Sequence, residues 1–341
     1  MSSSSRSAPA LELLDLVQSH RVTAVIYVAA KLGIAELLSS GPRSLSELVT
    51  ATGANHSALA RLLTTLATIG ICARVGPERY SLTEIGRSLD GRTERSLKDW
   101  VIFEGELLSK SWNGMLETIM TGKTAAELQG FANSFELMAR VPENVRIFNA
   151  AMADLTGLVT VDVLAAYDFS RFTHLMDVGG GSGELIGAVV TRFAQIRATV
   201  FDLPRCEEAA IAHLARLGLS DRADFRAGDF FESIPAAADG IILKSVIHDW
   251  NDARSCTILR NCRRAIAAAG TLLLVERLMP ATPELDAEHK SHALSDLNML
   301  RGPGGMERTE AQYRDLLDGT GFRVSAIAPA GRFNVIEAKP V

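Results

Sequence analysis

Cysteine is scarce in this sequence, and its early part contains no apolar run of membrane-spanning length. The four cysteines, Cys72, Cys206, Cys256 and Cys262, lie far apart and lack the spacing of a metal site. This pattern argues against a disulfide framework and favours a reducing compartment. The most apolar early stretch, residues 22–30, is too short to cross a bilayer, and the first residues lack the apolar core of a signal peptide. We therefore expect a cytoplasmic protein without a membrane-spanning segment.

Neither sign of charge dominates the chain. The 35 Lys and Arg residues and 40 Asp and Glu residues give a formal net charge of -5 at pH 7. A nucleic-acid partner requires a basic face for its phosphates, so this balance argues against one. A hydrophobic content of 47% and a charged content of 22% are typical of a globular protein. The length of 341 residues suggests two domains, or one large domain with an extension.

The N-terminal part alternates helix and turn signals. Apolar residues recur at helical spacing over residues 10–40 and predict two helices. Ser44 is a candidate cap for the next helix, and Asn55 or Ser57 for the one after it. Two short runs, ICARV and RYSLT, flank a Gly-Pro turn and predict a hairpin. Helix, helix and hairpin in this order form a winged-helix pattern, which we assign to residues 1–96.

A winged helix raises the alternative of a DNA-binding regulator. The candidate recognition helix, residues 55–70, carries only Arg61 as a firm positive charge and is otherwise rich in Leu, Ala and Thr. Such a face suits packing against another subunit better than contact with a phosphate backbone. Residues 97–166 look helical throughout and are predicted to form a linker that contributes to the substrate pocket, with a helix that begins at Pro142.

From residue 174 the pattern changes to strands that alternate with helices. Strands are predicted in HLMDVGG, ATVFDLP, ADFRAGD, DGIILKS and TLLLVERL. The helix before TLLLVERL is expected to run from residue 252 to a glycine stop at residue 270. Such alternation gives a parallel sheet covered on both faces, and a closing hairpin of FRVSAIAP and FNVIEAK makes one edge antiparallel. We predict a Rossmann-like, doubly wound α/β domain over residues 167–341.

A glycine-rich loop, DVGGGSG at residues 177–183, follows the first of these strands. Glycines such as Gly179 and Gly181 let the backbone approach a ligand closely. The G-x-G-x-x-G spacing of dinucleotide loops fails from either glycine, and no Gly-Lys-Ser/Thr follows for a phosphate-binding loop. A ligand with an adenosine but no phosphates fits better, and S-adenosyl-L-methionine is such a ligand.

Acidic residues follow the next two strands. Asp202, in FDLP, can accept hydrogen bonds from ribose hydroxyls. Asp229, in GDFF, can receive an adenine amino group, and Phe230 can cover the ring face. Either acid alone could be a loop cap. Three consecutive strand ends with glycine or acid favour a nucleoside site.

The segment KSVIHDWND, residues 244–252, places a histidine directly after a buried-looking strand. In a parallel sheet, His248 and Glu276, which ends the next strand, share one rim with the glycine loop. A carboxylate beside an imidazole raises its pKa and holds one tautomer, so His248 is a candidate to remove a proton from a hydroxyl. The alternative for His248 is a loop histidine packed on Trp250, and the alternative for Glu276 is a solvated acid at a strand end.

The ordered motifs DVGGGSGELI, FDLP, GDFF, KSVIHDWND, VERLMP and GGMERTE resemble the class I S-adenosylmethionine-dependent O-methyltransferases of the caffeate and hydroxyindole type. The resemblance covers nearly the whole chain. It implies that His248 is the general base and that Glu276 and Glu307 flank and orient it. The positions that it assigns to the cofactor are Gly179, Asp202, Asp229, Phe230 and Lys244.

The resemblance also implies a homodimer formed through the N-terminal helices and a small hydroxylated aromatic acceptor from secondary metabolism. The positions expected to face the acceptor are Phe148, Met152, Asp249, Asn298 and Met299. Methionine adapts to flat, irregular guests. Transfer to nitrogen or carbon stays open as an alternative, as do hydroxylation and decarboxylation on the same fold.

We predict no metal ion. A magnesium-dependent transferase would need clustered carboxylate or amide ligands at the fourth and fifth strand ends, where this chain offers a histidine and Glu276. His289 and His292 have a spacing that could bind metal, but no third ligand is evident nearby. We expect them to be pocket-rim or surface histidines.

Overall fold

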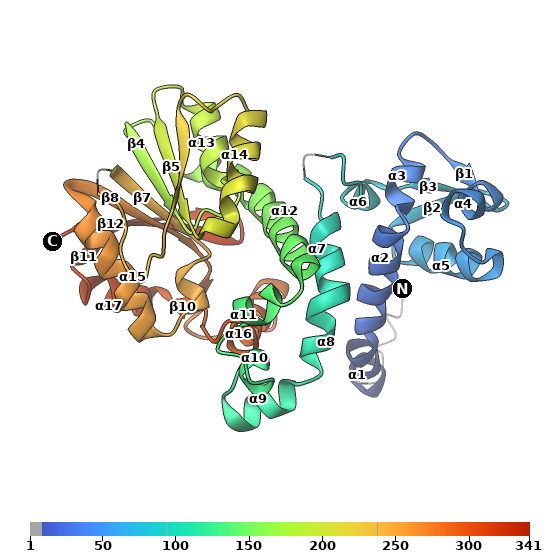
Figure 1. Ribbon diagram of the computed structural model, residues 1–341. Helices are drawn as coiled ribbons and strands as arrows, with labels where there is room; N and C mark the ends of the chain where they lie inside the picture. The colour runs from blue at the N-terminus through green and yellow to red at the C-terminus, as the bar shows by residue number, and fades with distance from the viewer. Residues whose placement is uncertain (1–8, 94, 237) are drawn as a thin grey trace, which may run out of the picture. The chain divides into compact units, whose positions relative to one another are not determined.

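The computed structural model of the chain describes residues 9–93, 95–236 and 238–341 (Figure 1). The chain falls into two compact units. The first comprises Met1–Ser111 with Arg146–Leu155, and the second comprises Trp112–Val145 with Thr156–Val341. The long helix α12, Pro142–Ala166, therefore contributes to both units. The finer division at residues 96 and 166 stays a prediction.

The first unit contains the predicted helices and hairpin, with one helix more than expected. Its elements up to residue 82 are α1 (Pro9–Gln18), α2 (His20–Lys31), α3 (Ile34–Leu38), β1 (Arg43–Ser44), α4 (Leu45–Thr52), α5 (His56–Thr68), β2 (Cys72–Gly76) and β3 (Arg79–Leu82). Residues 9–40 form three helices, not two, because a turn at Ser19 ends α1 and Gly33 separates α2 from α3. Gly33 has a left-handed φ of 66°, which glycine adopts at little cost. Ser44 caps α4, and Asn55 rather than Ser57 caps α5.

The segment from residue 84 to residue 166 consists of short helices before α12. They are α6 (Glu84–Arg87), α7 (Lys98–Phe103), the π-helical η1 (Glu104–Leu108), α8 (Ser109–Trp112), α9 (Met115–Thr121), α10 (Ala125–Leu128) and α11 (Ser134–Ala139). The prediction that residues 97–166 are helical throughout is therefore wrong. Gly122 and Gly130 have left-handed φ angles of 70° and 83°, which interrupt a helix. Pro142 begins α12 as predicted.

Helix α12 is long and apolar enough to cross a membrane by length and composition alone. Several of its apolar residues are instead part of packed cores. Ile147 and Ala151 pack with Phe103 in the first unit, and Val159 and Val163 lie in a core of the second. Core helices of folded domains pass the same length test.

The second unit is built on a sheet of seven strands in the order β11-β12-β8-β7-β4-β5-β6. The strands are β4 (His174–Val178), β5 (Arg197–Asp202), β6 (Ala223–Ala227), β7 (Ala238–Lys244), β8 (Ile266–Glu276), β11 (Phe322–Ala330) and β12 (Phe333–Pro340). The five strands from β4 to β8 are parallel to one another, and β12 is antiparallel to both of its neighbours. The predicted Rossmann-like α/β fold with an antiparallel edge hairpin is confirmed.

Helices cover both faces of this sheet (Figure 1). They are α13 (Glu184–Arg192) and α14 (Glu207–Arg216), whose buried residues join one core, and α15 (Asp252–Ala265) and α17 (Glu310–Asp318), whose buried residues join the other. Strand β7 is buried on both sides: Ile242 contributes to the first core, and Ile241 and Leu243 to the second. Each fully buried side chain of this kind stabilises the fold by about 1.5–3 kcal/mol. A strand that is apolar on both faces can expose polar groups only at its ends.

One boundary in this unit differs from the prediction. Helix α15 ends at Ala265, and the alanine-rich residues 266–270 begin β8 instead of continuing the helix to Gly270. Ile266 pairs with Ala238 of β7, while the next pair joins Gly240 to Thr271, so the intervening residues form an irregularity in the strand. The strand pairing outweighs the helix propensity of alanine.

Candidate active site

The site lies at the carboxyl ends of the parallel strands, because the turns that follow them meet at one edge of the sheet. The glycine loop follows β4, and Asp202 ends β5. His248 lies in a short 3-10 turn, η3 (Ile247–Asp249), directly after β7, and Glu276 ends β8. Glu307 is further along the chain, immediately before β10 (Arg308–Thr309), which pairs with β9 (Leu278–Met279) after β8.

The glycine loop needs glycine for both conformation and space. Gly179 and Gly181 have left-handed φ angles of 74° and 57°. A Cβ on Gly179 would lie 2.7 Å from Cγ2 of Val246 and 3.7 Å from the Phe230 ring. The Gly181 amide donates to Oδ2 of Asp202 at 2.8 Å. The loop is thus held close to the residues that follow β5, β6 and β7.

The other predicted cofactor residues surround this loop. Asp229 uses Oδ1 to accept from the Phe231 amide at 2.8 Å. The ring of Phe230 lies 6.2 Å from the Trp250 ring in an edge arrangement, which creates an aromatic lining beside Asp229. Lys244 extends its ammonium to Oγ1 of Thr156 at 2.9 Å. Its side chain therefore leads to helix α12.

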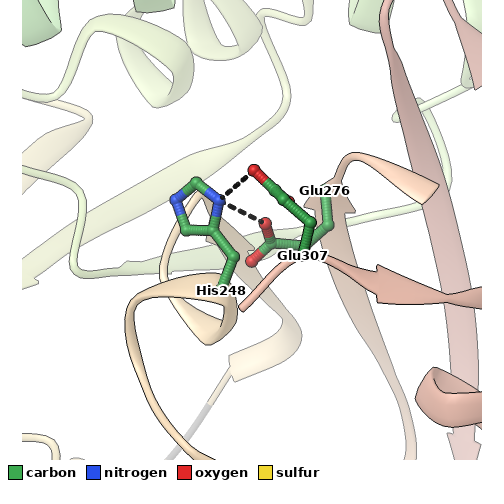
Figure 2. A group of neighbouring side chains, drawn as sticks. All are labelled: His248, Glu276 and Glu307. Atoms are coloured by element: carbon green, nitrogen blue, oxygen red, sulfur yellow. Dashed lines mark hydrogen bonds and ion pairs between the residues drawn. The ribbon is translucent and has the colours of Figure 1, made fainter. Parts of the chain in front are cut away.

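His248 is buried against two carboxylates that come from different parts of the chain (Figure 2). Its Nδ1 lies 3.1 Å from Oε1 of Glu307, at hydrogen-bonding distance, and 3.8 Å from Oε2 of Glu276. Its Nε2 lies 3.6 Å from Oδ1 of Asp249. The structure therefore brings together the three residues predicted to be catalytic. Because Nδ1 is directed at Glu307, Nε2 is the nitrogen left to act on another molecule.

The two glutamates make different contacts. Oε1 of Glu276 accepts from the backbone amides of Val246 and Ile247 at 3.1 and 2.9 Å. Oε1 of Glu307 accepts from the imidazole and from the Ser295 hydroxyl at 2.7 Å. Glu276 thus holds the turn before His248, and Glu307 holds the ring itself.

The charges of this cluster are strongly coupled. Burial alone would lower the pKa of His248, but the negative charges of Glu276 and Glu307 outweigh burial and raise that pKa to about 10. Burial raises the pKa of Glu276 to about 7 against the attraction of His248. Burial also acts to raise the pKa of Glu307, but its contacts with His248 and Ser295 hold that pKa below the usual value. The pair at neutral pH is therefore an imidazolium and the Glu307 carboxylate.

The same three side chains could hold a metal ion by proximity alone, since their ligand atoms lie within 4.8 Å of one another. The 3.1 Å distance between His248 and Glu307 is that of a hydrogen bond. The absence of a metal stays a prediction.

Of the positions predicted to face the acceptor, three belong to the second unit and two to the first. Asp249 adjoins His248, and burial raises its pKa to about 6. Asn298 and Met299 lie on α16 (Ala287–Arg301), and Met299 is buried. Phe148 and Met152 belong to the first unit, and their part in the acceptor pocket stays a prediction.

Three further residues at this site did not stand out in the sequence. Ser295 donates to Glu307, and Asp296 accepts from the Glu307 amide at 2.9 Å. Arg308 contacts the turn that contains His248. The signal available in the sequence was their position. Arg308 follows Glu307 directly, and Ser295 and Asp296 lie within one helical turn before Asn298. His292 is buried and not a surface residue, and burial lowers its pKa.

Comparison with known proteins gives consistent matches over most of the chain. An O-methyltransferase domain model matches residues 112–323, and an O-methyltransferase dimerisation domain model matches residues 14–90. Phenazine O-methyltransferase PhzM of Lysobacter antibioticus is 38% identical over 330 residues, 96% of each chain. Acetylserotonin O-methyltransferase of Bos taurus is 31% identical, again over 96% of each chain.

Solved structures give the same result. The crystal structure of LaPhzM superposes with a TM-score of 0.91 at 37% identity and covers 98% of this chain and 100% of its own. Human N-acetylserotonin methyltransferase, solved in complex with S-adenosylmethionine, has a TM-score of 0.89 at 26% identity and covers 100% of this chain and 99% of its own.

Proposed function

The chain belongs to the S-adenosylmethionine-dependent O-methyltransferase family, and on this premise we propose that it methylates a hydroxyl of a small aromatic metabolite with His248 as general base. The observation that carries this proposal is the hydrogen bond between His248 Nδ1 and Glu307, which leaves Nε2 available. The family's dimerisation domain makes the protein a homodimer. Exposed leucines of α1 supply apolar surface for that interface: Leu11, Leu13, Leu14 and Leu16.

The acceptor class follows from the names of the relatives. Their acceptors include phenazines, a 2,7-dihydroxy-5-methyl-1-naphthoate and a 3-amino-4-hydroxybenzoate. All of these are small aromatic rings, and the two last named carry hydroxyls. We propose an acceptor of this class for the present chain, bound beside Asp249, Asn298 and Met299.

The glycine loop and its surroundings fit S-adenosyl-L-methionine. Gly179 leaves no room for a Cβ, so the backbone itself forms the surface of the loop. Asp202 accepts the amides of Gly181 and Leu203, one at each oxygen, and Asp229 accepts the Phe231 amide at one oxygen. Each carboxylate oxygen has a second lone pair, which leaves acceptor sites for ribose or adenine donors. When bound, the cofactor supplies a methyl group on a positively charged sulfur. Gly179, Gly181, Asp202, Asp229, Phe230 and the backbone of Lys244 are the groups that would hold it.

The contribution of His248 is the removal of the hydroxyl proton. A phenol with a pKa of about 10 and a free imidazole of about 6.5 are mismatched by roughly 3.5 units, or about 4.8 kcal/mol. The raised pKa of His248, about 10, removes most of this mismatch. In the neutral form of the ring Nε2 accepts the proton, while Nδ1 keeps its hydrogen bond to Glu307, so the ring stays in one orientation. The remaining task of the site is alignment, which can supply roughly 7–11 kcal/mol.

Replacement of His248 tests the proposal directly. His248→Ala should retain affinity for S-adenosylhomocysteine, because the predicted cofactor contacts come from other residues. It should lose about 100-fold or more in kcat, the contribution typical of a general base. Full activity at neutral pH in a folded His248→Ala protein would refute the assignment.

We propose that the reaction needs no metal. Chelation with EDTA followed by gel filtration should leave kcat unchanged. Loss of activity on chelation, restored by one divalent cation, would instead make His248, Glu276 and Glu307 metal ligands.

One relative supports a second candidate reaction. An 8-amino-8-demethylriboflavin N,N-dimethyltransferase of Streptomyces davaonensis is 32% identical over 318 residues. Methyl transfer to an aromatic amine is therefore the alternative for this chain. Mass spectrometry of products from paired hydroxyl and amino acceptors distinguishes the two, and methylation of only the amine would replace our proposal.

We also propose a cytoplasmic location. The four cysteines are free, and Cys72, Cys206 and Cys262 are buried, as expected of a protein kept in a reducing compartment. Recovery from the membrane or secreted fraction of its native cells would contradict this location.

A further inference from the structure

Four consecutive residues, 305–308, lie against the turn that carries His248. The Met306 amide donates to the His248 carbonyl at 2.9 Å, and Glu307 accepts from the imidazole. A Cβ on Gly305 would collide with the same carbonyl oxygen, so only glycine permits this approach. The segment therefore contacts both the side chain and the backbone of His248.

Arg308 extends this contact to both sides of His248. It is 1% exposed. Its Nη1 donates to the Ile247 carbonyl at 3.0 Å, and its Nη2 donates to the Trp250 carbonyl at 2.8 Å. The two carbonyls bracket His248 in the chain. A single planar guanidinium thus fixes the start and the end of the turn.

The ion pair of Arg308 does not by itself account for the burial of its charged guanidinium. Within the described part of the chain its carboxylate partner is Asp252, which accepts from Nε and Nη2 at 3.0 and 2.8 Å, and the Asp252 side chain is 70% exposed. Burying a guanidinium costs free energy that such a partner offsets only in part. The remaining donors are used on backbone carbonyls and on the Ser255 hydroxyl at 3.3 Å. These bonds position the turn.

The backbone amides that precede His248 are held by Glu276, which accepts from Val246 and Ile247. The amides are thus bound from β8 and the carbonyls from β10. Glu307 orients the imidazole, and Arg308 holds the backbone of the same turn. Because the two residues are adjacent in the chain, a shift of one would also shift the other.

We propose that Arg308 is a positioning residue of methyl transfer, which holds residues 247–250 so that His248 meets Glu307 through Nδ1 and presents Nε2 to the acceptor. The inference rests on the proposed role of His248. In this role Arg308 acts through that ring, because its hydrogen bonds go to residues that precede and follow His248. A displacement of about 1 Å in such a site can cost about 100-fold in rate.

Arg308→Lys is the principal test, because lysine keeps the charge but loses the planar fork. We expect kcat to fall by about 10- to 100-fold, while the dissociation constant of S-adenosylhomocysteine changes by less than about threefold. Arg314→Gln is the matched control: Arg314 lies on α17, is about half exposed and pairs with Glu310. The control should behave as the parent enzyme.

A double-mutant cycle separates positioning from general stabilisation. In a His248→Ala background, Arg308→Lys should cause no further loss of kcat, because the ring through which Arg308 acts is gone. An equal loss in both backgrounds would overturn the proposal. Full activity of His248→Ala alone would overturn the base assignment, and with it the role of Arg308.

Asp252→Asn keeps the test valid if Arg308→Lys does not fold. This change removes the carboxylate that orients the guanidinium and lies on an exposed side chain. A smaller loss of kcat, again absent in the His248→Ala background, is expected. An unchanged kcat in a folded Asp252→Asn protein would overturn the proposal in that case.

Discussion

The contact between Glu307 and His248 makes a specific prediction about pH dependence. Glu307→Gln keeps the size and one acceptor oxygen of the side chain but removes the charge that lies 3.1 Å from Nδ1. A hydrogen bond to a charged group contributes about 1.5–3 kcal/mol. At about 1.4 kcal/mol for each pKa unit, its loss should lower the pKa of His248 by about 1–2 units. The imidazole of the variant is therefore a weaker base.

Two opposite changes in the rate should follow. The parent enzyme holds a proton on His248 at neutral pH, because the raised pKa is about 10, so kcat/KM should rise with pH through the alkaline range. In Glu307→Gln this rise should occur about 1–2 pH units lower, while the alkaline plateau falls by about 10- to 150-fold. The assay is kcat/KM for one hydroxylated aromatic acceptor across the neutral and alkaline range. Because the acceptor is the same, its own ionisation contributes equally to both profiles.

Glu310→Gln, on the exposed surface of α17, is the control for a change of one charge. It should leave the profile unchanged. A Glu307→Gln profile that rises at the same pH as the parent profile would refute the reasoning, since Glu307 would then not set the basicity of His248.

Three further predictions concern the surroundings of the site. Gly179→Ala should weaken S-adenosylhomocysteine binding by about tenfold or more, because a left-handed alanine costs about 1–2 kcal/mol and its Cβ would strike Val246. The Cβ of Gly181→Ala meets no atom within 4 Å, so this variant should lose less affinity. Equal affinities of the two variants by calorimetry would contradict this prediction. Burial raises the pKa of Asp177 to about 7 from its ordinary value of 3.8, so between these two pH values the folded state keeps a proton that the unfolded state releases. The free energy of unfolding should therefore fall as pH rises from about 3.8 to about 7. Thermal unfolding of Asp177→Asn should lack this part of the pH dependence, and an unchanged pH dependence would contradict the prediction. Glu276→Gln, which keeps an oxygen for the backbone amides, should slow methyl transfer without weakening cofactor affinity, and a change confined to that affinity would contradict its role.

Most of the fold could be predicted from local patterns. The run DGIIL predicts a strand buried on both faces, and β7 is that strand. The glycine loop and the strand-end acids could be predicted because each directly follows a strand that the sequence pattern identifies, and the structure contains these strands. Residues 266–270 were predicted incorrectly, because alanine favours a helix locally and only the pairing of Ile266 with Ala238 selects the strand.

The site was predictable as a set of residues but not as a set of contacts. His248 and Glu276 follow neighbouring strands, so topology places them together. The direct partner of Nδ1 is instead Glu307, 59 residues away in sequence, and only the resemblance indicated it. The role of Arg308 depends on a side chain that reaches two backbone carbonyls, and a sequence does not record such contacts.

The central claim is that Nε2 of His248 removes the acceptor proton. A crystal structure with S-adenosylhomocysteine and a hydroxylated aromatic acceptor tests it most directly. We predict Nε2 within about 2.6–3.2 Å of the acceptor oxygen, with Nδ1 still bonded to Glu307. An acceptor oxygen paired with a different side chain, while His248 points elsewhere, would contradict the account.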